Sequence, residues 1–335
     1  MGRVFGGVKP MGLSLEVRPY GFALTRPLRT ATGVWQRRCG WLLRLEGRSR
    51  LGWGEVSPLD AHGHARCAQW LQALPPGEWT EAALEDQVQT APAEVAFGLG
   101  AALAELQGLV GPGSGGDWLA APASALLLPA GQAMPAALHQ LLTQASTEVS
   151  FTVKWKVASA PAAEERDLLA WLLAALPPQA RLRLDANGGW EMDEAQRWAA
   201  RLQAEPRLEW LEQPLAVEHY AGHRRLLEMV PVALDEGLRE HPHWRQTWPG
   251  WQVRRPVLEG DPRPLLRQLQ QRVPRLMLST AFETGIGARW LGHLSALQQL
   301  GPTPVAPGLA PGWCPEGALW SAEPAQVWAA AEAMA

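Results

Sequence analysis

Cysteine, lysine and long apolar segments are all scarce in this 335-residue sequence. The three cysteines, Cys39, Cys67 and Cys314, are too few and too scattered for a disulfide framework or a cysteine-rich metal site. No apolar run reaches the ~18 residues that suggest a membrane span, and the start of the chain lacks the apolar core of a signal peptide. The net charge of -3 disfavours a general nucleic-acid binder. We therefore expect a cytoplasmic protein that acts on a small molecule, as a monomer or a homodimer.

The shortage of lysine makes the remaining lysines informative. Only three of the 30 basic residues are lysines, and two of these, Lys154 and Lys156, lie two positions apart. The single asparagine, Asn187, and the single isoleucine, Ile286, point to a G+C-rich coding sequence as the cause of the bias. Arginine stays protonated near neutral pH, whereas a lysine can be tuned to release its proton. Two lysines retained side by side indicate a task that needs a titratable amine.

The first third of the chain has the pattern of an antiparallel sheet followed by helices. Residues 13–17, 39–45 and 51–56 are strand-like, and residues 81–109 contain helical spacing of apolar residues. Residues 111–116 (Gly-Pro-Gly-Ser-Gly-Gly) then break the pattern and mark a domain junction. This segment fits the G-x-G-x-x-G pattern, but it follows a helix and contains proline, so a linker is favoured over a dinucleotide site.

After residue 118, short apolar strands alternate with amphipathic helices. A repeat of about 20 to 30 residues is typical of strand–helix units in a parallel sheet. Eight such strands favour a closed α/β barrel of the TIM type over an open doubly wound sheet, and a barrel places its chemistry at the carboxyl ends of the strands. The predicted strands are residues 125–128, 152–157, 182–185, 208–212, 232–235, 252–255, 276–279 and 303–306, with helices at 162–175, 192–204 and 286–300.

Three acidic residues end three successive predicted strands: Asp185, Glu212 and Asp235. At one rim of a barrel their carboxylates would repel one another unless a cation neutralised them. Oxygen-only ligands suit Mg²⁺, with Mn²⁺ as a possible substitute. The alternative is that each acid caps the helix that follows it. Three acids at corresponding positions favour the metal site.

Lys154 and Lys156 lie on the same face of one predicted strand, because side chains alternate along a strand. In a barrel this face is the interior, and Trp155 would face the surrounding helices. Burial and mutual repulsion would both lower the pKa of such a lysine and make it a useful base. A solvated edge strand is the alternative. Mg²⁺ holding a substrate carboxylate would acidify the neighbouring C–H bond by stabilising an enediolate, and Lys156 would take the proton.

Seven short motifs follow one another along the chain: Arg38-Cys39-Gly40-Trp41, Gly52-Trp53-Gly54-Glu55, Lys154-Trp155-Lys156, Asp185-Ala186-Asn187, Glu212-Gln213-Pro214, Asp235-Glu236 and Phe282-Glu283-Thr284-Gly285. Their order and spacing resemble those of the enolase superfamily, muconate-lactonizing subgroup, over nearly the whole chain. The resemblance implies an α+β capping domain (residues 1–117, completed by about 310–335). This domain would close over a modified (β/α)7β TIM-type barrel formed by residues 118–309.

The resemblance also implies the roles of the site residues. Asp185, Glu212 and Asp235 would bind Mg²⁺, Lys156 would act as general base and acid, and Lys154 would be a further catalytic group. For substrate contacts, Ser279, Thr280 and Gly308 match segments that family members place near the substrate.

One position departs from the family pattern. Members usually have a lysine before proline on the sixth strand, whereas this chain has Arg255 before Pro256. Arginine is a poor base, so a racemase or epimerase that needs a base on each face of the carbon would be crippled. A syn dehydration needs only Lys156, and Arg255 would stabilise the enediolate through its charge.

The resemblance together with this departure favours a lyase that dehydrates 2-succinyl-6-hydroxy-2,4-cyclohexadiene-1-carboxylate to an aromatic acid in menaquinone or phylloquinone biosynthesis. An N-succinylamino acid racemase or dipeptide epimerase is the alternative within the superfamily. A non-catalytic barrel that serves as a binding scaffold is the alternative from another class.

A histidine pair at helical spacing, His219 and His223, has the i, i+4 geometry of a zinc-binding helix. Tyr220 stands where a metalloprotease needs a glutamate. We therefore expect both histidines to be surface residues.

Overall fold

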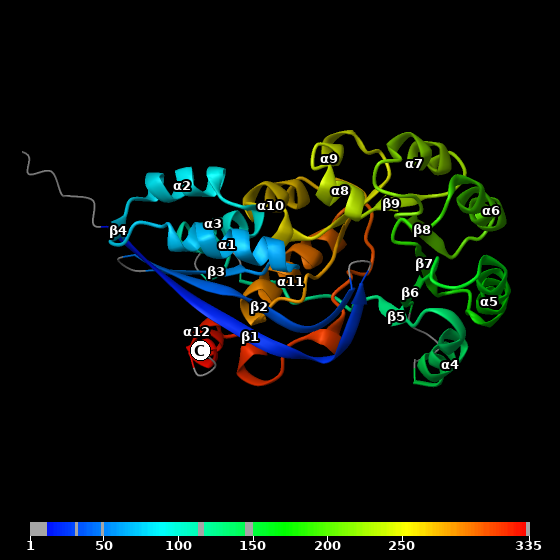
Figure 1. Ribbon diagram of the computed structural model, residues 1–335, viewed down its shortest axis with the longest axis horizontal. Coiled ribbons are helices and arrows are strands. Elements are labelled where there is room, and N and C mark those ends of the chain that lie inside the picture. The colour runs from blue at the N-terminus through cyan, green and yellow to red at the C-terminus, as the bar shows by residue number, and fades with distance from the viewer. Residues whose placement is uncertain (1–11, 31–32, 48–49, 113–116, 145–149, 333–335) are drawn as a thin grey trace, which may run out of the picture.

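The computed structural model describes residues 12–30, 33–47, 50–112, 117–144 and 150–332. Two sheets organise these residues, one antiparallel with four strands and one parallel with seven. They form the two halves of the molecule, as Figure 1 shows. No described helix has both the length and the apolar character needed to cross a bilayer.

The antiparallel sheet has the strand order β3-β2-β1-β4, and three helices cover one of its faces. Two glycines of β3 allow close packing: a Cβ at Gly52 would lie 1.9 Å from the Ala102 carbonyl oxygen, and one at Gly54 would lie 1.9 Å from that of Gly98. The elements are β1 (Leu13–Thr30), β2 (Gly33–Glu46), β3 (Leu51–Val56), β4 (Glu78–Trp79), α1 (Ala61–Gln72), α2 (Glu81–Thr90) and α3 (Ala93–Leu106). We call this half the cap.

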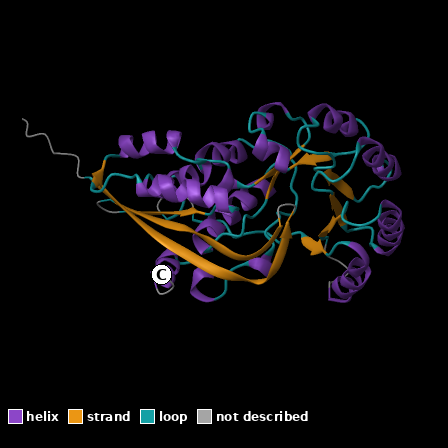
Figure 2. Ribbon diagram, in the orientation of Figure 1, coloured by secondary structure: helices purple, strands orange, loops and turns teal. Residues whose placement is uncertain are grey.

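The parallel sheet curls into a barrel with the strand order β5 to β11 in sequence. Its helices lie on the outside, which Figure 2 shows clearly. The strands are β5 (Leu126–Leu128), β6 (Thr152–Lys156), β7 (Arg181–Asp185), β8 (Leu208–Glu212), β9 (Val232–Leu234), β10 (Trp251–Arg254) and β11 (Leu276–Leu278). The helices are α4 (Met134–Gln144), α5 (Ala162–Ala175), α6 (Met192–Leu202), α7 (Tyr220–Leu227), α8 (Glu236–Glu240), α9 (Trp244–Thr247), α10 (Pro262–Gln270) and α11 (Gly285–Gln299). The predicted α/β barrel is confirmed.

The eighth predicted strand, residues 303–306, does not form a regular strand, so this prediction was wrong in detail. Pro304 lies within it and Pro302 and Pro307 flank it, and proline has no N–H to donate to a ladder. The chain closes the barrel directly after this segment, at Pro307 and Gly308. The Pro307 carbonyl accepts from the Ala125 N–H at 2.9 Å, and Gly308 forms a single bridge with Ser279.

Tryptophans fill the space between barrel strands and outer helices. Trp155 is fully buried and faces outward, with its ring centroid 6.2 Å from that of Trp198. Trp198 in turn stacks on Trp190 at 4.8 Å. Since Trp155 faces the helices, Lys154 and Lys156 on the opposite face of β6 point into the barrel.

The C-terminal segment returns to the cap. Its elements are α12 (Pro324–Glu332) and short 3₁₀ turns at Pro311–Trp313 and Gly317–Trp320, with two further turns at Gly131–Ala133 and Pro256–Leu258. Val327 and Ala331 of α12 are buried in one cluster with Tyr20, Phe22 and Leu42 of the cap sheet. The last helix thus completes the hydrophobic core beneath β1. Of the predicted junction, residues 113–116 lie outside the described residues.

Candidate active site

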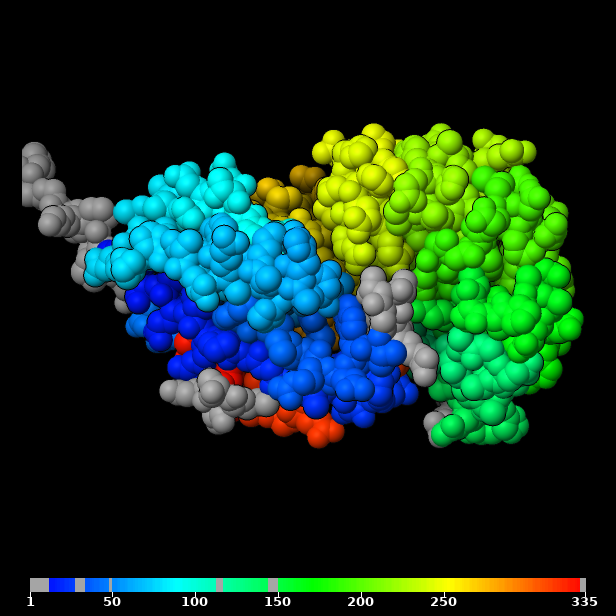
Figure 3. Space-filling model, in the orientation of Figure 1, coloured from blue at the N-terminus to red at the C-terminus, as the bar shows by residue number. Residues whose placement is uncertain are grey.

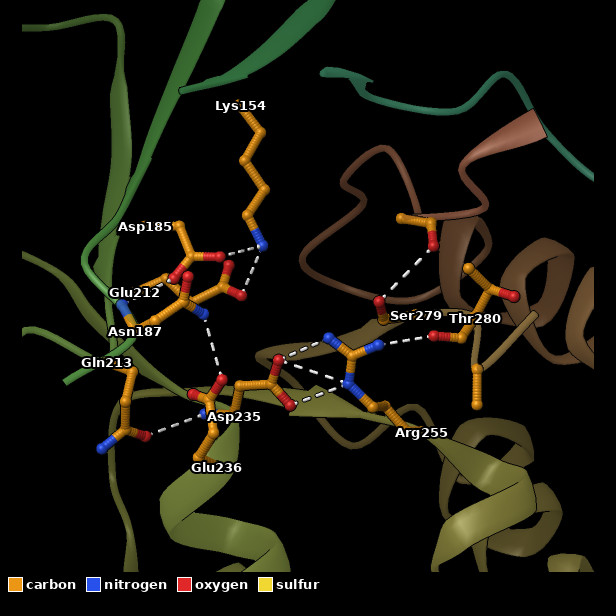
Figure 4. Close-up of polar contacts among 12 residues, drawn as sticks. Lys154, Asp185, Asn187, Glu212, Gln213, Asp235, Glu236, Arg255, Ser279 and Thr280 are labelled. Atoms are coloured by element: carbon orange, nitrogen blue, oxygen red, sulfur yellow. Dashed lines mark hydrogen bonds and ion pairs between the residues drawn. The ribbon is translucent and has the colours of Figure 1, made fainter. Parts of the chain in front are cut away.

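The three predicted carboxylates lie at the carboxyl ends of neighbouring barrel strands. In the strand register Asp185 pairs with Glu212, and Asp235 directly follows the adjacent strand β9. Glu212 is fully buried, and Asp185 and Asp235 are 5% and 6% exposed. Figure 4 shows the three side chains turned toward one region of the barrel mouth. Parallel strands with matched register therefore bring together acids that are 50 residues apart in the chain.

Lys154 connects two of these carboxylates. Its Nζ lies 2.6 Å from Glu212 Oε1 and 2.8 Å from Asp185 Oδ2. Burial alone would lower the pKa of this ammonium, but Asp185, Glu212 and Asp235 together outweigh burial and hold the pKa above its usual value. The expectation of a lowered lysine pKa was thus wrong for Lys154, because three carboxylates stabilise its charged form.

Burial has the opposite consequence for one partner of this lysine. It raises the pKa of Glu212, and the negative charges of Asp185 and Asp235 add to the rise, while Lys154 opposes it. A lone carboxylate here would be costly. The site is stable because cations face its anions.

Arg255 forms an ion pair with the third carboxylate, that of Asp235. Its Nε and Nη2 lie 2.9 Å from Asp235 Oδ1 and 2.5 Å from Asp235 Oδ2, and its Nη1 donates to the Thr280 carbonyl. Burial opposes ionisation of Asp235, but the guanidinium prevails and holds the pKa of this carboxyl below its usual value. Arg255 is therefore a fixed cation of the barrel mouth.

Among the described residues no group of three or more His, Cys, Asp or Glu side chains is arranged to hold a metal ion. Lys154 and Arg255 already bind oxygens of all three carboxylates. The chemistry of the donor set nevertheless fits Mg²⁺, because three buried carboxylates at the ends of neighbouring strands offer oxygen ligands. Each carboxylate oxygen already accepts from at least one donor of the protein and has a further lone pair with which it can contact a cation.

Lys156 ends β6 beside this cluster. It is the register partner of Asp185 on β7, and its side chain is half-buried. No described residue forms a hydrogen bond or ion pair with its Nζ. The two lysines of the motif therefore differ: Lys154 is held by carboxylates, whereas Lys156 has an amine free of protein partners within the described residues.

Three polar residues that sequence reasoning left without a role hold the strand ends in place. The Asn187 amide donates to Glu236 Oε1 at 3.0 Å, and Gln213 Oε1 accepts from the N–H groups of Asp235 and Gly237 at 3.3 and 3.0 Å. Burial, Asp235 and Asp185 raise the pKa of Glu236 to about 7. The sequence signals were the single asparagine and the place of all three residues in the motifs that contain the acids. The positive φ angles of Asn187 (45°) and Gln213 (39°) are visible only in the structure.

The predicted substrate contacts gather at the opposite side of the barrel mouth. Ser279 and Thr280 are 7% and 5% exposed, and Ser279 Oγ lies 3.4 Å from the Gly308 carbonyl. The Thr280 hydroxyl donates to Glu283 Oε2 at 2.5 Å and accepts from the Phe282 N–H. The hydroxyl hydrogen of Thr280 is thus already engaged in a hydrogen bond within its own loop. The substrate role of these three residues stays a prediction.

The histidine pair corrects another expectation. His219 is exposed as predicted, but His223 is fully buried. Its Nδ1 contacts the His219 carbonyl at 2.9 Å, and its Nε2 lies 3.3 Å from the Leu215 N–H. Burial lowers the pKa of His223 to about 4, so the ring is neutral and part of the core.

Two family models match the chain in line with this architecture. The MenC N-terminal domain matches residues 20–106, and the enolase C-terminal domain-like family matches residues 137–248. An α+β cap over a barrel with acids at successive strand ends, together with these matches, defines a member of the enolase superfamily.

Individual relatives narrow the class. The o-succinylbenzoate synthase of Thermosynechococcus vestitus is 36% identical over 83% of this chain and 87% of the relative, and that of Edwardsiella ictaluri is 30% identical over 82% and 81%. The crystal structure of o-succinylbenzoate synthase from Thermosynechococcus elongatus, complexed with Mg in its active site, has a TM-score of 0.78. The two sequences are 30% identical, and the matched region covers 96% of this chain and 100% of the crystallised chain. The chain belongs to the o-succinylbenzoate synthase family, whose members are hydro-lyases.

Proposed function

We propose that the chain dehydrates 2-succinyl-6-hydroxy-2,4-cyclohexadiene-1-carboxylate to 2-succinylbenzoate, with Lys156 as both base and acid. The observation that carries this proposal is the register pairing of Lys156 with Asp185, which puts an amine free of described partners beside three buried carboxylates. Aromatisation of the ring helps to drive the reaction. The product would enter menaquinone or phylloquinone synthesis.

Asp185, Glu212 and Asp235 would hold the metal ion, Mg²⁺ or Mn²⁺. When bound, Mg²⁺ supplies a Lewis-acid charge that makes the C–H bond next to the substrate carboxylate more acidic. Lys154 limits the repulsion between Asp185 and Glu212, since its ammonium lies within 2.8 Å of both.

Lys156 performs both proton transfers on one face of the ring. Its neutral amine removes the proton from the carbon that bears the carboxylate, and the resulting ammonium then gives that proton to the departing hydroxide. The C–H and C–OH bonds break, one water leaves, and no oxidant or reductant is consumed. General acid–base help of this kind contributes about 10²- to 10⁴-fold to a rate.

Arg255 supports dehydration but not racemisation. Its ion pair with Asp235 keeps it protonated, so it does not serve as a second base on the opposite face. We expect Arg255→Lys to retain dehydration within about tenfold, which corresponds to about 1.4 kcal/mol of barrier. Steady-state kinetics measures this, with N-succinylamino acid racemisation assayed alongside. A collapse by several orders of magnitude would mean that the guanidinium geometry itself is required.

The capping domain is proposed to comprise residues 1–117 and about 310–335, with residues 118–309 as the barrel. The shared core of α12 and β1 supports this division. A groove of about 690 Å³ separates cap from barrel beside α1, lined among others by Leu59, Arg66 and Arg239. Figure 3 shows the two lobes.

Three free cysteines are consistent with the proposed cytoplasmic location.

The experiment is an assay of the purified chain with substrate and Mg²⁺. We expect an aromatic product and the loss of one water per molecule, detected by absorbance and mass spectrometry. EDTA should stop turnover and added Mg²⁺ should restore it. Racemisation of N-succinylamino acids without dehydration would overturn the lyase assignment. No turnover of any acid and no metal binding would leave a binding scaffold.

A further inference from the structure

Glu212 has a second partner besides Lys154. The Trp210 Nε1–H donates to Glu212 Oε2 at 3.2 Å, while Lys154 contacts Glu212 Oε1. Trp210 and Glu212 lie two positions apart on β8, so both side chains face the barrel interior. Both residues are fully buried. Each oxygen of this carboxylate therefore has one fixed donor, and the carboxylate plane has one defined orientation.

The indole of Trp210 is itself held from two sides. The guanidinium carbon of Arg183 lies 4.1 Å from the Trp210 ring centroid, and the Trp251 ring packs at 4.8 Å. Arg183 is fully buried, and its Nε donates to Glu209 Oε2 at 2.5 Å. A cation over an indole face is attractive, most strongly where water is excluded. Glu209, Arg183 and Trp210 thus form a chain of contacts that ends at the Glu212 carboxylate.

We propose that Trp210 is a positioning residue for the metal site: its indole N–H sets the orientation in which Glu212 presents its carboxylate to Mg²⁺. This inference rests on the proposed function, in which Glu212 is a metal ligand. A glutamate carboxylate rotates freely about its last bond unless its oxygens are held. Partners that orient ligands in this way typically account for about 10- to 100-fold in metal affinity.

The test compares Trp210→Phe with the control Trp251→Phe. Both changes remove one indole from the same pair of packed rings, but of the two only Trp210 donates to a described carboxylate. Binding of Mn²⁺ alone, without substrate, is measured by electron paramagnetic resonance, and Mg²⁺ binding by calorimetry. We expect Trp210→Phe to weaken both by about tenfold or more, and Trp251→Phe to change them less than threefold. Thermal melting without metal checks that both variants are folded.

A second measurement needs no variant. In the unmodified chain the indole ¹H–¹⁵N signal of Trp210 should shift when Mg²⁺ saturates the site, while exchanging slowly with water. Wild-type affinity in Trp210→Phe, or an unmoved Trp210 signal at metal saturation, would overturn the role of Trp210 alone. A wild-type chain that binds neither Mn²⁺ nor Mg²⁺ would overturn the proposed function, and this inference with it.

Discussion

Lys156 is the residue on which the proposed chemistry depends most. Its amine has no described partner, in contrast to Lys154, which two carboxylates hold. We expect Lys156→Ala to lower kcat for dehydration by about 10³-fold or more, because no other described amine lies free at this rim. Lys156→Arg is the matched control that keeps the charge and loses the basicity, and it should fall comparably. Near-normal turnover by either variant would refute proton transfer by this residue.

His223 carries a pH dependence of stability. Because burial lowers its folded pKa to about 4 from 6.5, the unfolded chain binds the proton more tightly. Its contribution is complete above pH 6.5 and is lost as the pH falls toward 4, by about 3 kcal/mol in total. Urea unfolding of wild type and His223→Gln between pH 7.5 and 4.5 should show a smaller pH slope in the variant. The exposed His219→Gln should leave the slope unchanged, and an equal slope in both variants would exclude His223 as its source.

Strand β3 and helix α3 depend on glycine for their close approach. A Cβ at Gly54 would meet the backbone oxygen of Gly98 at 1.9 Å, so the two elements would have to separate. We expect Gly54→Ala to lower the free energy of unfolding by about 3 kcal/mol, the upper end of the usual cost of overpacking. Gly21→Ala on β1 is the control, since its nearest neighbour is Cys39 Sγ at 3.4 Å. Equal stability of the two variants in urea would contradict this packing argument.

At the scale of the whole molecule, one buried carboxylate joins the cap to the barrel. Glu55 of β3 is fully buried and accepts from the Tyr20 hydroxyl at 2.6 Å, the Thr284 hydroxyl at 2.6 Å and the Gly287 N–H at 2.9 Å. Thr284 and Gly287 belong to the start of α11, directly after the loop that contains Thr280. Two motifs that are 230 residues apart, Gly52-Trp53-Gly54-Glu55 and Phe282-Glu283-Thr284-Gly285, thus meet at one junction.

Loss of the Glu55 charge should weaken this junction. Burial raises the pKa of Glu55, so the charge carries a desolvation cost, but several donors point at it. Glu55→Gln replaces one acceptor oxygen by a donor and leaves buried N–H groups unpaired, which should cost about 1–3 kcal/mol of stability. Glu16→Gln, at an exposed ion pair, should cost less than about 1 kcal/mol. Urea unfolding decides, and a Glu55→Gln variant as stable as wild type would show that the junction does not depend on the charge.

Much of this protein was determined by the sequence alone. The apolar strand pattern predicted seven of the barrel strands, because buried parallel strands have a local signature. The same pattern placed Asp185, Glu212 and Asp235 at strand ends, where parallel topology makes them neighbours, and the two-residue spacing put Lys154 and Lys156 on one face. The order of the motifs predicted the superfamily, which the comparisons confirm.

Only the tertiary structure decided which charges pair. Lys154 binds Asp185 and Glu212, Arg255 binds Asp235, and Trp210 donates to Glu212, all through contacts between different strands or rotamer choices that no local pattern encodes. The balance between burial and these partners reversed the expected pKa shift of Lys154. Closure of the barrel without a regular eighth strand was likewise decided by where the proline-rich segment meets β5 and β11. Side-chain partnerships arise from distances in space, and the folded chain alone sets those distances.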